Sequence, residues 1–228
     1  RFSRLLPLLA VPLLAIALGL FAAGRDATPA QAAPGDLLST VTVPVASSSL
    51  CCGIGIAYDG TDILYTNTND PTIYKTDLSG ANNGSLPIVG PTNCCNAIAY
   101  DASTGKLWGG TWDQCDIYEI DLGTGAATLK HDGLTPCALG FVDGLAGDPV
   151  NDSLWWSDDV NCTVTEINKT TGATIQSFNF FSLIGNPPCT DGANVNGGNS
   201  GLALGLDHTL FMGSNGNGVI YSADADTV

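Results

Sequence analysis

A short motif recurs four times along this chain and constrains its fold more than any other feature. Each copy starts with Gly or Ala, continues with Ile or Leu and ends in Asp. The copies are Gly55–Asp59, Ala97–Asp101, Gly144–Asp148 and, more loosely, Ala203–Asp207. Their aspartates lie 42, 47 and 59 residues apart, so we expect one structural unit repeated four times.

Each copy is followed by further stretches with the character of β-strands. The second stretches are Ile63–Thr66, Lys106–Gly109, Ser153–Trp156 and Thr209–Met212. The third stretches are Ile73–Asp77, Ile117–Asp121, Val164–Asn168 and Val219–Ser222. In the second and third units a Thr-Gly turn leads to a fourth stretch, Ala127–Leu129 or Ala173–Phe178. Four short antiparallel strands that repeat every 40 to 60 residues or so are typical of β-propeller blades, which bury both faces against their neighbours.

We therefore predict an all-β fold, a β-propeller of four-stranded antiparallel blades with about four blades present. The expected blades are residues 53–90, 95–131, 140–180 and 200–226. An ordinary β-sandwich is the alternative, but it does not explain the same order of motifs in four copies. The composition agrees, because only Glu119 and Glu166 of the 22 acidic residues are Glu, and Asp is the carboxylate that turns prefer.

The two ends of the repeat suggest how the ring closes. The segment 37–44 resembles a fourth strand, whereas the last unit stops after its third strand, near Asp226. We expect the early strand to complete the last blade. The chain also begins with Arg and ends inside a blade pattern, so we expect it to be part of a longer, six-bladed protein.

The N-terminal segment has the layout of a secretory signal peptide. Arg1 and Arg4 precede an apolar run, Leu5–Phe21, and Ala30-Gln31-Ala32 provides a cleavage motif. We predict a signal peptide at 1–32 and a secreted β-propeller domain at 33–228; an uncleaved membrane anchor is the alternative. The formal net charge of −15 disfavours nucleic acid and anionic membranes as partners of the mature protein.

Eight cysteines in a secreted chain indicate disulfide bonds, and vicinal pairs do not fit the spacing of a zinc site. In a propeller with the innermost strand first, the loops before first strands and between second and third strands share one face. All eight cysteines fall in such loops. The repeat predicts two pairs, Cys115–Cys137 and Cys162–Cys189. The four others, Cys51, Cys52, Cys94 and Cys95, allow three connectivities, which the sequence leaves open.

The units resemble the superfamily of six-bladed propellers with NHL repeats, YWTD repeats and gluconolactonase-like enzymes. Gly144–Ile167, which contains Leu-Trp-Trp-Ser-Asp-Asp, is similar to the YWTD pattern. This resemblance covers nearly all of residues 37–226 and specifies architecture rather than function, because the superfamily contains adhesion modules, enzymes and scaffolds.

Polar residues on the expected binding face give two candidate sites. Those that follow the second strand of successive units could ligate calcium, which takes 6 to 8 oxygen ligands, although turns alone also explain such residues. They are Asn69, Asp70, Asp113, Asp158, Asp159 and Asn215. The insertion 185–200 is the candidate recognition loop, with solvent-facing filler as the alternative; its polar residues are Asp191, Asn194, Asn196 and Asn199.

Catalysis finds less support in the sequence. His131 and His208 fall at different parts of their blades and lack a nucleophile motif, and both glutamates fall in third strands. The resemblance to gluconolactonase-like enzymes implies a glutamate at the central metal, and no inner strand offers one. We therefore expect a secreted, non-enzymatic propeller that presents a disulfide-braced face to an extracellular protein or carbohydrate, with calcium as the candidate cofactor. The alternative is a lactonase-type hydrolase with an Asp/Asn metal site.

Overall fold

The computed structural model describes residues 40–45, 55–67, 70–91, 94–111, 114–135, 137, 142–158, 161–180, 199–214 and 219–228. The chain divides at Thr40/Val41, and every described strand belongs to the second unit, Val41–Val228. The predicted signal peptide lies outside the described residues. Within the residues that the structure describes, no helix has the length and apolar character to span a membrane.

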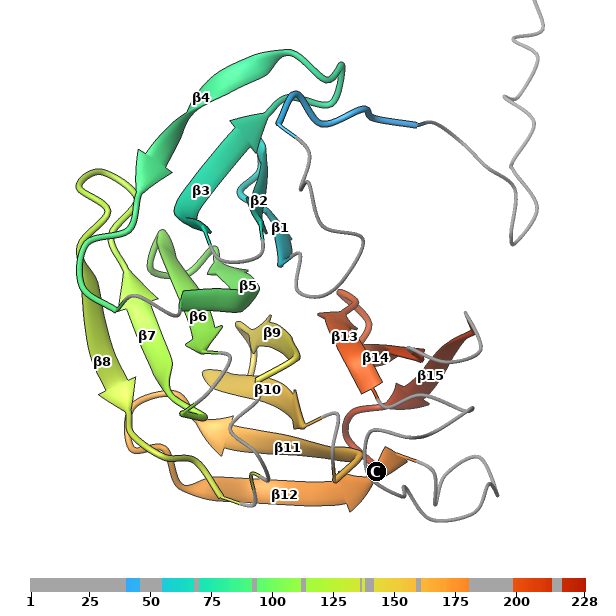
Figure 1. The fold of residues 1–228 in the computed structure, drawn as a ribbon. Coiled ribbons are helices and arrows are strands. Elements are labelled where there is room, and N and C mark those ends of the chain that lie inside the picture. The colour runs from blue at the N-terminus through green and yellow to red at the C-terminus, as the bar shows by residue number, and fades with distance from the viewer. Residues whose placement is uncertain are drawn as a thin grey trace, which may run out of the picture. The chain divides into compact units, whose positions relative to one another are not determined.

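The second unit is a β-propeller whose four antiparallel sheets, the blades, succeed one another around a common axis (Figure 1). Blade 1 contains β1 (Ile56–Tyr58), β2 (Ile63–Asn67), β3 (Asp70–Thr76) and β4 (Asn82–Pro87). Blade 2 contains β5 (Cys94–Asp101), β6 (Lys106–Thr111), β7 (Ile117–Ile120) and β8 (Ala127–His131). Blade 3 contains β9 (Gly144–Asp148), β10 (Ser153–Asp158), β11 (Thr163–Asn168) and β12 (Thr174–Asn179). Blade 4 contains β13 (Asn199–Leu204), β14 (Thr209–Ser214) and β15 (Ile220–Asp224).

The predicted fold class is therefore confirmed. The strands of blades 1 and 3 lie inside the ranges 53–90 and 140–180, whereas β5 and β13 each begin one residue before the ranges 95–131 and 200–226. In each blade the first strand lies nearest the axis and the later strands follow outward in chain order (Figure 1).

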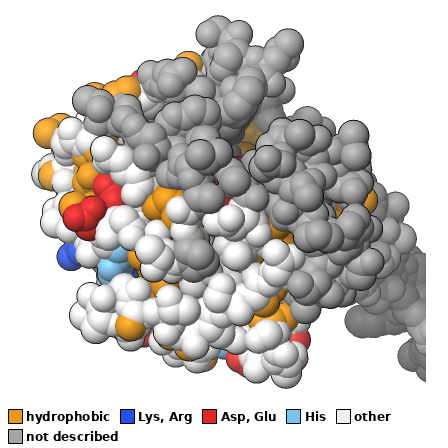
Figure 2. All heavy atoms as spheres, turned by 60° about the horizontal axis from the view of Figure 1, so that its bottom comes forward, with side chains coloured by type: hydrophobic (Ala, Val, Ile, Leu, Met, Phe, Trp, Pro, Cys, Tyr) orange, Lys and Arg blue, Asp and Glu red, His pale blue; other side chains and the backbone are white. Residues whose placement is uncertain are grey.

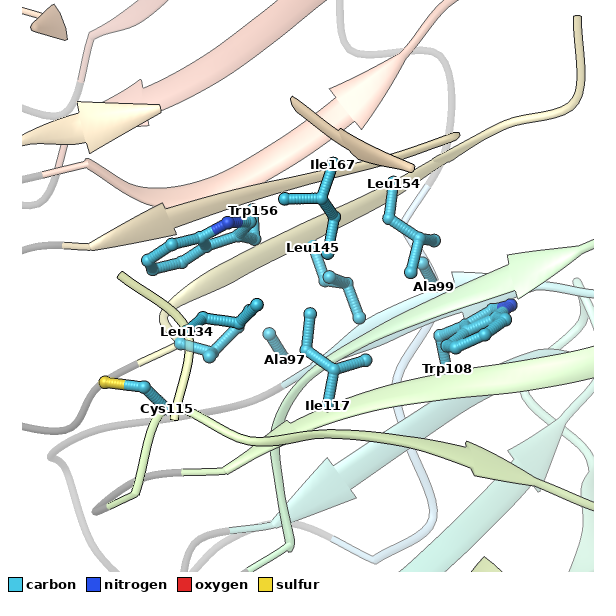
Figure 3. Packing of buried hydrophobic residues seen from close by; sticks show 11 residues of the cluster. Ala97, Ala99, Trp108, Cys115, Ile117, Leu134, Leu145, Leu154, Trp156 and Ile167 are labelled. Carbon is cyan, nitrogen blue, oxygen red and sulfur yellow. The ribbon is translucent and has the colours of Figure 1, made fainter. Parts of the chain in front are cut away.

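Among the described residues, the alternation of side chains along each strand builds three hydrophobic cores, one between each pair of successive blades. In β10, Trp156 packs in the core between blades 2 and 3, whereas its neighbour Trp155 packs in the core between blades 3 and 4. Figure 3 shows the first of these cores, where Trp156 and Leu145 of blade 3 lie opposite Ala97 of blade 2. Because side chains alternate between the two faces of a strand, a central blade contributes to two cores at once.

Strand pairing corrects the expected alignment of the fourth repeat. Leu204 pairs with Leu210, just as Gly147 pairs with Leu154 in blade 3. Gly205 therefore takes the place of the repeated aspartate, and Asp207 lies in the following turn. The fourth copy is thus Gly201–Gly205, and sequence comparison favoured the other alignment because it relied on the aspartate.

The abundance of aspartate follows from the turns. In the first three blades the aspartate that ends the motif accepts backbone N–H bonds from the turn that follows; the Asp59 carboxylate, for example, accepts from Thr61 and Asp62 at 2.8 and 2.7 Å. The turn after the third strand repeats this arrangement, with Asp77 accepting from Ser79 at 2.8 Å. The same role belongs to Asp101, Asp148, Asp121, Asn168 and Asp224. Most blades thus use two such side chains.

The expected closing strand is absent from the described residues. Residues 41–45 contain no strand and lie against blade 1, where the Val45 N–H donates to the Tyr65 hydroxyl at 3.2 Å and the Thr42 carbonyl lies near Gly80. The rest of the segment, residues 37–39, lies outside the described part of the chain.

Blade 1 on its side away from blade 2, and blade 4 on its side away from blade 3, are less buried than the faces between successive blades. Phe211 of β14 is 41% exposed, whereas Trp155, at the equivalent position of blade 3, is 1% exposed. Ile56 of β1 is 66% exposed, whereas its equivalent Ile98 in blade 2 is 3% exposed. Each core position therefore depends on the presence of an adjacent blade. Further blades, as in a six-bladed ring, stay a prediction.

Candidate functional site

A central cavity of about 300 Å³ lies on the propeller axis. The first two residues of the repeated motif line it in all four blades, and side chains of β14 and β15 add to its wall. Its main apolar contributors are Ile56, Ile98, Leu145, Leu202 and Phe211. The charged lining residue is Asp143, whose carboxylate accepts a hydrogen bond from the Asn96 amide at 2.8 Å. The cavity is therefore suited to a ligand with an apolar surface.

Disulfides cluster on the side of the propeller where these inner strands begin. Cys115, between β6 and β7, bonds to Cys137, which precedes β9; this is one of the two pairs expected from the repeat. Cys94 and Cys95 form a vicinal disulfide at the start of β5, which resolves one of the open pairings. Cys162 is also disulfide-bonded, whereas its expected partner Cys189 lies outside the described residues, as do Cys51 and Cys52.

The vicinal disulfide belongs to the core between blades 1 and 2. Both cysteines are buried there, together with Leu64, Ile98 and Leu107. A Cβ added at Gly109 would overlap the Cys95 Sγ, so β6 needs glycine where the disulfide packs against its backbone. This contact could not be predicted from the sequence, because Gly109 lies within an otherwise ordinary strand.

The structure describes two of the six predicted calcium ligands. The Asp70 carboxylate accepts the Tyr74 hydroxyl at 2.5 Å, and this hydrogen bond is the main reason why the pKa of Tyr74 is raised. Asp158 is buried and accepts from the Asn161 amide at 2.8 Å. The others, Asn69, Asp113, Asp159 and Asn215, lie outside the described residues.

Among the described residues, no group of three or more His, Cys, Asp or Glu side chains could hold a metal ion. The calcium site therefore stays a prediction. The candidate recognition loop also stays a prediction. Its residues Asp191, Asn194 and Asn196 lie outside the described residues, and the backbone of Asn199 begins β13 opposite Ser214.

A second pocket, of about 410 Å³, lies at the other ends of the inner strands, and we call it the turn-side pocket. Sequence reasoning did not identify it. Two equivalent tyrosines line it, Tyr58 and Tyr100, each at the fourth position of the repeated motif. Leu204 and Leu206 of blade 4 and Val150 of blade 3 add apolar walls. The signal in the sequence was the recurrence of Tyr directly before the motif aspartate.

A buried ion pair joins blades 2 and 3 beside this pocket. The Lys169 ammonium lies 2.7 Å from the Asp101 carboxylate and 2.5 Å from that of Asp152. Burial favours the neutral acid, but hydrogen bonds from Lys169, Ser103 and Thr104 outweigh it and hold the pKa of Asp101 well below its ordinary value. Burial likewise opposes the Lys169 charge, yet its two carboxylate partners raise the pKa of Lys169.

His131 supports the same interface from β8. Its Nε2 lies 3.0 Å from the Lys169 carbonyl oxygen, and its ring stacks on Trp108 with 6.3 Å between centroids. Burial lowers the pKa of His131, so the neutral ring is favoured. The structure thus gives this histidine a packing role between blades, as expected from its separation from His208.

His208 makes the corresponding link between blades 3 and 4. Its Nδ1 lies 3.0 Å from the Asp226 carboxylate, and its Nε2 lies 3.5 Å from the buried Asp148 carboxylate, near enough for an ion pair but without a hydrogen bond. The hydrogen bond to Asp226 is the main reason why the pKa of His208 is raised. Among the described residues on the face seen in Figure 2, charged and histidine side chains are few.

The two glutamates lie in third strands, as expected, and away from both cavities. Glu119 of β7 pairs with Lys130 at 3.3 Å. Glu166 of β11 is buried and accepts the Ser153 hydroxyl at 2.5 Å and the Gln176 amide at 2.9 Å. These bonds fix the blade-3 sheet and leave neither glutamate beside a lining residue of the central cavity.

No protein-family model matches the chain, and no curated protein sequence matches it. Many solved structures are similar in fold, and three of them are described here. The chain in the structure titled "Crystal structure of Nidogen/Laminin Complex" has a TM-score of 0.55 and 16% identity over 75% of this chain and 59% of that one. The glutaminyl cyclase of Myxococcus xanthus has a TM-score of 0.52 and 14% identity over 74% of this chain and 70% of that one.

The third is the hydrazine synthase of Kuenenia stuttgartiensis, with a TM-score of 0.50 and 13% identity over 85% of this chain and 50% of that one. The chain therefore spans about half of the hydrazine synthase chain and three fifths of the nidogen/laminin chain. At these identities the likeness concerns the fold alone, and a fold does not determine function. Together with the arrangement of its own sheets, the comparisons identify the chain as a β-propeller.

Proposed function

We propose that this chain is a secreted, non-enzymatic β-propeller that binds an extracellular protein or carbohydrate at its disulfide-braced face. The central cavity carries the proposal, because the first two residues of the repeated motif line it in all four blades, toward the side of the Cys94–Cys95 and Cys115–Cys137 disulfides. Binding sites are often concave, mostly apolar and built from loops on a rigid scaffold.

The disulfides support this function by limiting movement where a ligand would bind. Cys115–Cys137 connects a loop of blade 2 to the segment before blade 3 across 22 residues of sequence. Loops that are already ordered lose less conformational entropy on binding, so a braced face binds more tightly than a mobile one with the same contacts.

The cavity lining favours a ligand that inserts a largely uncharged group. Apolar side chains predominate, and the Asp143 carboxylate already bonds to Asn96. A sugar ring with an apolar face or an aliphatic side chain of a protein partner fits this lining. The overall negative charge disfavours polyanionic glycans as ligands.

The test is a screen of the full, oxidised chain against arrays of neutral glycans and of extracellular proteins, followed by titration of each hit. Gly201 provides the decisive variant, because it lines the cavity and a Cβ added there would meet no atom within 4 Å. Gly201→Leu should therefore occupy part of the cavity and weaken binding at least about tenfold, equivalent to 1.4 kcal/mol. Thr128→Leu, on the exposed outer strand β8, is the matched control and should bind normally.

Equal binding by both variants would show that the hit does not use the cavity. Calcium is tested separately by thermal melts in chelator and in excess Ca²⁺. At a hundred times its dissociation constant, calcium should stabilise a specific site by about 2.7 kcal/mol. Turnover of lactones or esters that disappears on metal removal would overturn the non-enzymatic proposal.

A further inference from the structure

We propose that the turn-side pocket is a second binding site, for an organic ammonium ion such as a methylated amine. The described residues that line it are all different from those that line the central cavity, so this site does not depend on the function proposed above. Three properties of the described residues support the inference: the shape of the pocket, its aromatic and apolar walls, and the charge around it.

The shape and walls select a small ligand with an apolar surface. A volume of about 410 Å³ accommodates a small organic molecule. Tyr58 is half-exposed, and its hydroxyl donates to the Gly60 carbonyl at 2.9 Å, which constrains the ring at the pocket wall. Tyr100 occupies the equivalent position of blade 2, and Leu204 and Val150 provide aliphatic contacts. A fully hydrated inorganic ion would leave these walls without a partner.

The surrounding charge favours a cation. The basic groups beside the pocket are already held by carboxylates, since Lys169 contacts both Asp101 and Asp152 and His208 lies between Asp148 and Asp226. Each cluster therefore contains two carboxylates and one basic side chain, Lys169 or His208. Its net charge stays negative even when the basic side chain is protonated. Further carboxylates come from the neighbouring turns, at Asp59 and Asp207. An anionic ligand would meet repulsion, whereas a cation would be attracted.

An organic ammonium ion satisfies both requirements at once. Its alkyl groups replace water against leucine and valine, and its charge interacts with the faces of aromatic rings, a combination that binds quaternary ammonium ligands elsewhere. A neutral molecule of the same shape would keep the apolar contacts and lose the electrostatic attraction. The comparison of these two ligands therefore isolates the charge.

The experiment titrates the full chain with choline and, in parallel, with its neutral isostere 3,3-dimethylbutan-1-ol, by calorimetry or by NMR shifts of the pocket residues. We expect choline to bind about tenfold or more tightly than the isostere, and we expect salt to weaken choline alone. Equal affinities for the two ligands, or no binding of choline at millimolar concentrations, would overturn the proposal.

Variants of Tyr58 locate the site. Tyr58→Phe keeps the ring and should retain choline binding, whereas Tyr58→Leu should weaken it about 3- to 30-fold. Because this side chain is half-exposed, both variants should fold, which a thermal melt verifies. Choline binding that is unchanged in Tyr58→Leu would also refute the assignment. Gly201→Leu narrows the central cavity and should leave choline binding unchanged, which separates this site from the one proposed above.

Discussion

Replacing Lys169 with methionine should destabilise the propeller strongly, because the substitution leaves a buried carboxylate without its cation. The Lys169 ammonium lies 2.7 Å from the Asp101 carboxylate, and the two side chains are 8% and 3% exposed. At an effective dielectric constant of about 20, the attraction at this distance is roughly 6 kcal/mol before the cost of desolvation. Removing one partner of such a buried pair typically costs about 3–5 kcal/mol.

We expect the lower end of that range, because Asp101 keeps other partners. Its carboxylate still accepts bonds from the Ser103 N–H at 2.9 Å and the Thr104 hydroxyl at 2.9 Å. A loss of about 3 kcal/mol corresponds to a decrease in Tm of roughly 6–12 °C for a domain of this size. Thermal melts of oxidised protein at neutral pH, followed by circular dichroism, measure the effect.

Lys106→Met is the matched control. Lys106 also pairs with an aspartate, Asp121, at 2.5 Å, but these side chains are 32% and 41% exposed. Solvent screens an exposed pair, so this variant should change Tm little. The double variant Lys169→Met/Asp101→Asn should recover part of the lost stability, because it removes the uncompensated charge. If Lys169→Met and Lys106→Met lowered Tm equally, burial would not govern the energetics of this pair.

The pair also predicts sensitivity to acid. The pKa of Asp101 is held below its ordinary value, so the stability that it contributes is complete above about pH 4, the usual value for unfolded Asp, and decreases as pH falls toward the folded pKa. Asp101→Asn should reduce the slope of stability against pH in that range, as measured by melts between about pH 2 and 5. An unchanged slope would assign the acid sensitivity to other carboxylates.

Three further substitutions test separate features. Cys115→Ser opens a loop of 22 residues and should cost about 3 kcal/mol, measured by denaturant unfolding. Reduction of the wild type should cost at least as much, because it also breaks Cys94–Cys95, and an unchanged stability of Cys115→Ser would contradict the prediction. Gly109→Ala should cost about 1–3 kcal/mol, because the new methyl group overlaps the Cys95 Sγ, and a neutral effect would mean that β6 can move away. Since the pKa of His208 is raised, its contribution to stability is present below about pH 6.5 and is lost as pH rises through the folded pKa. His208→Gln should therefore flatten the dependence of Tm on pH above that value, and an unchanged profile would show that the bond to Asp226 is energetically unimportant.

Much of the fold could be predicted because short segments within each repeat determine its strands and turns. The period of the motif and the alternation of apolar residues define the strands, and the turn aspartates mark their ends. The fourth blade was aligned two residues away from its true register because Gly205 replaces the aspartate there. Pairing partners are set by the whole sheet, and a motif match cannot detect such a substitution.

The sites were harder to predict because they depend on residues far apart in sequence. Lys169 and Asp101 are separated by 68 positions, and nothing in either local segment indicates that they meet. Tyr58 and Tyr100 were visible as a recurrence, but only the blade arrangement shows that the last positions of all inner strands surround one pocket. The vicinal disulfide was one of three permitted pairings until the structure placed Cys94 and Cys95 in one core.

The alternation of Trp155 and Trp156 between two cores implies that stability is shared unequally along the series of blades. Blades 2 and 3 each have neighbours on both sides, whereas blade 1 and blade 4 each expose one face, at Ile56 and Phe211. In a linear array of this kind, local opening starts at the ends and proceeds inward. Amide hydrogens should therefore exchange fastest in the two outer blades and slowest in the middle pair, and any ligand or further blade that covers an outer face would slow the exchange of the entire array.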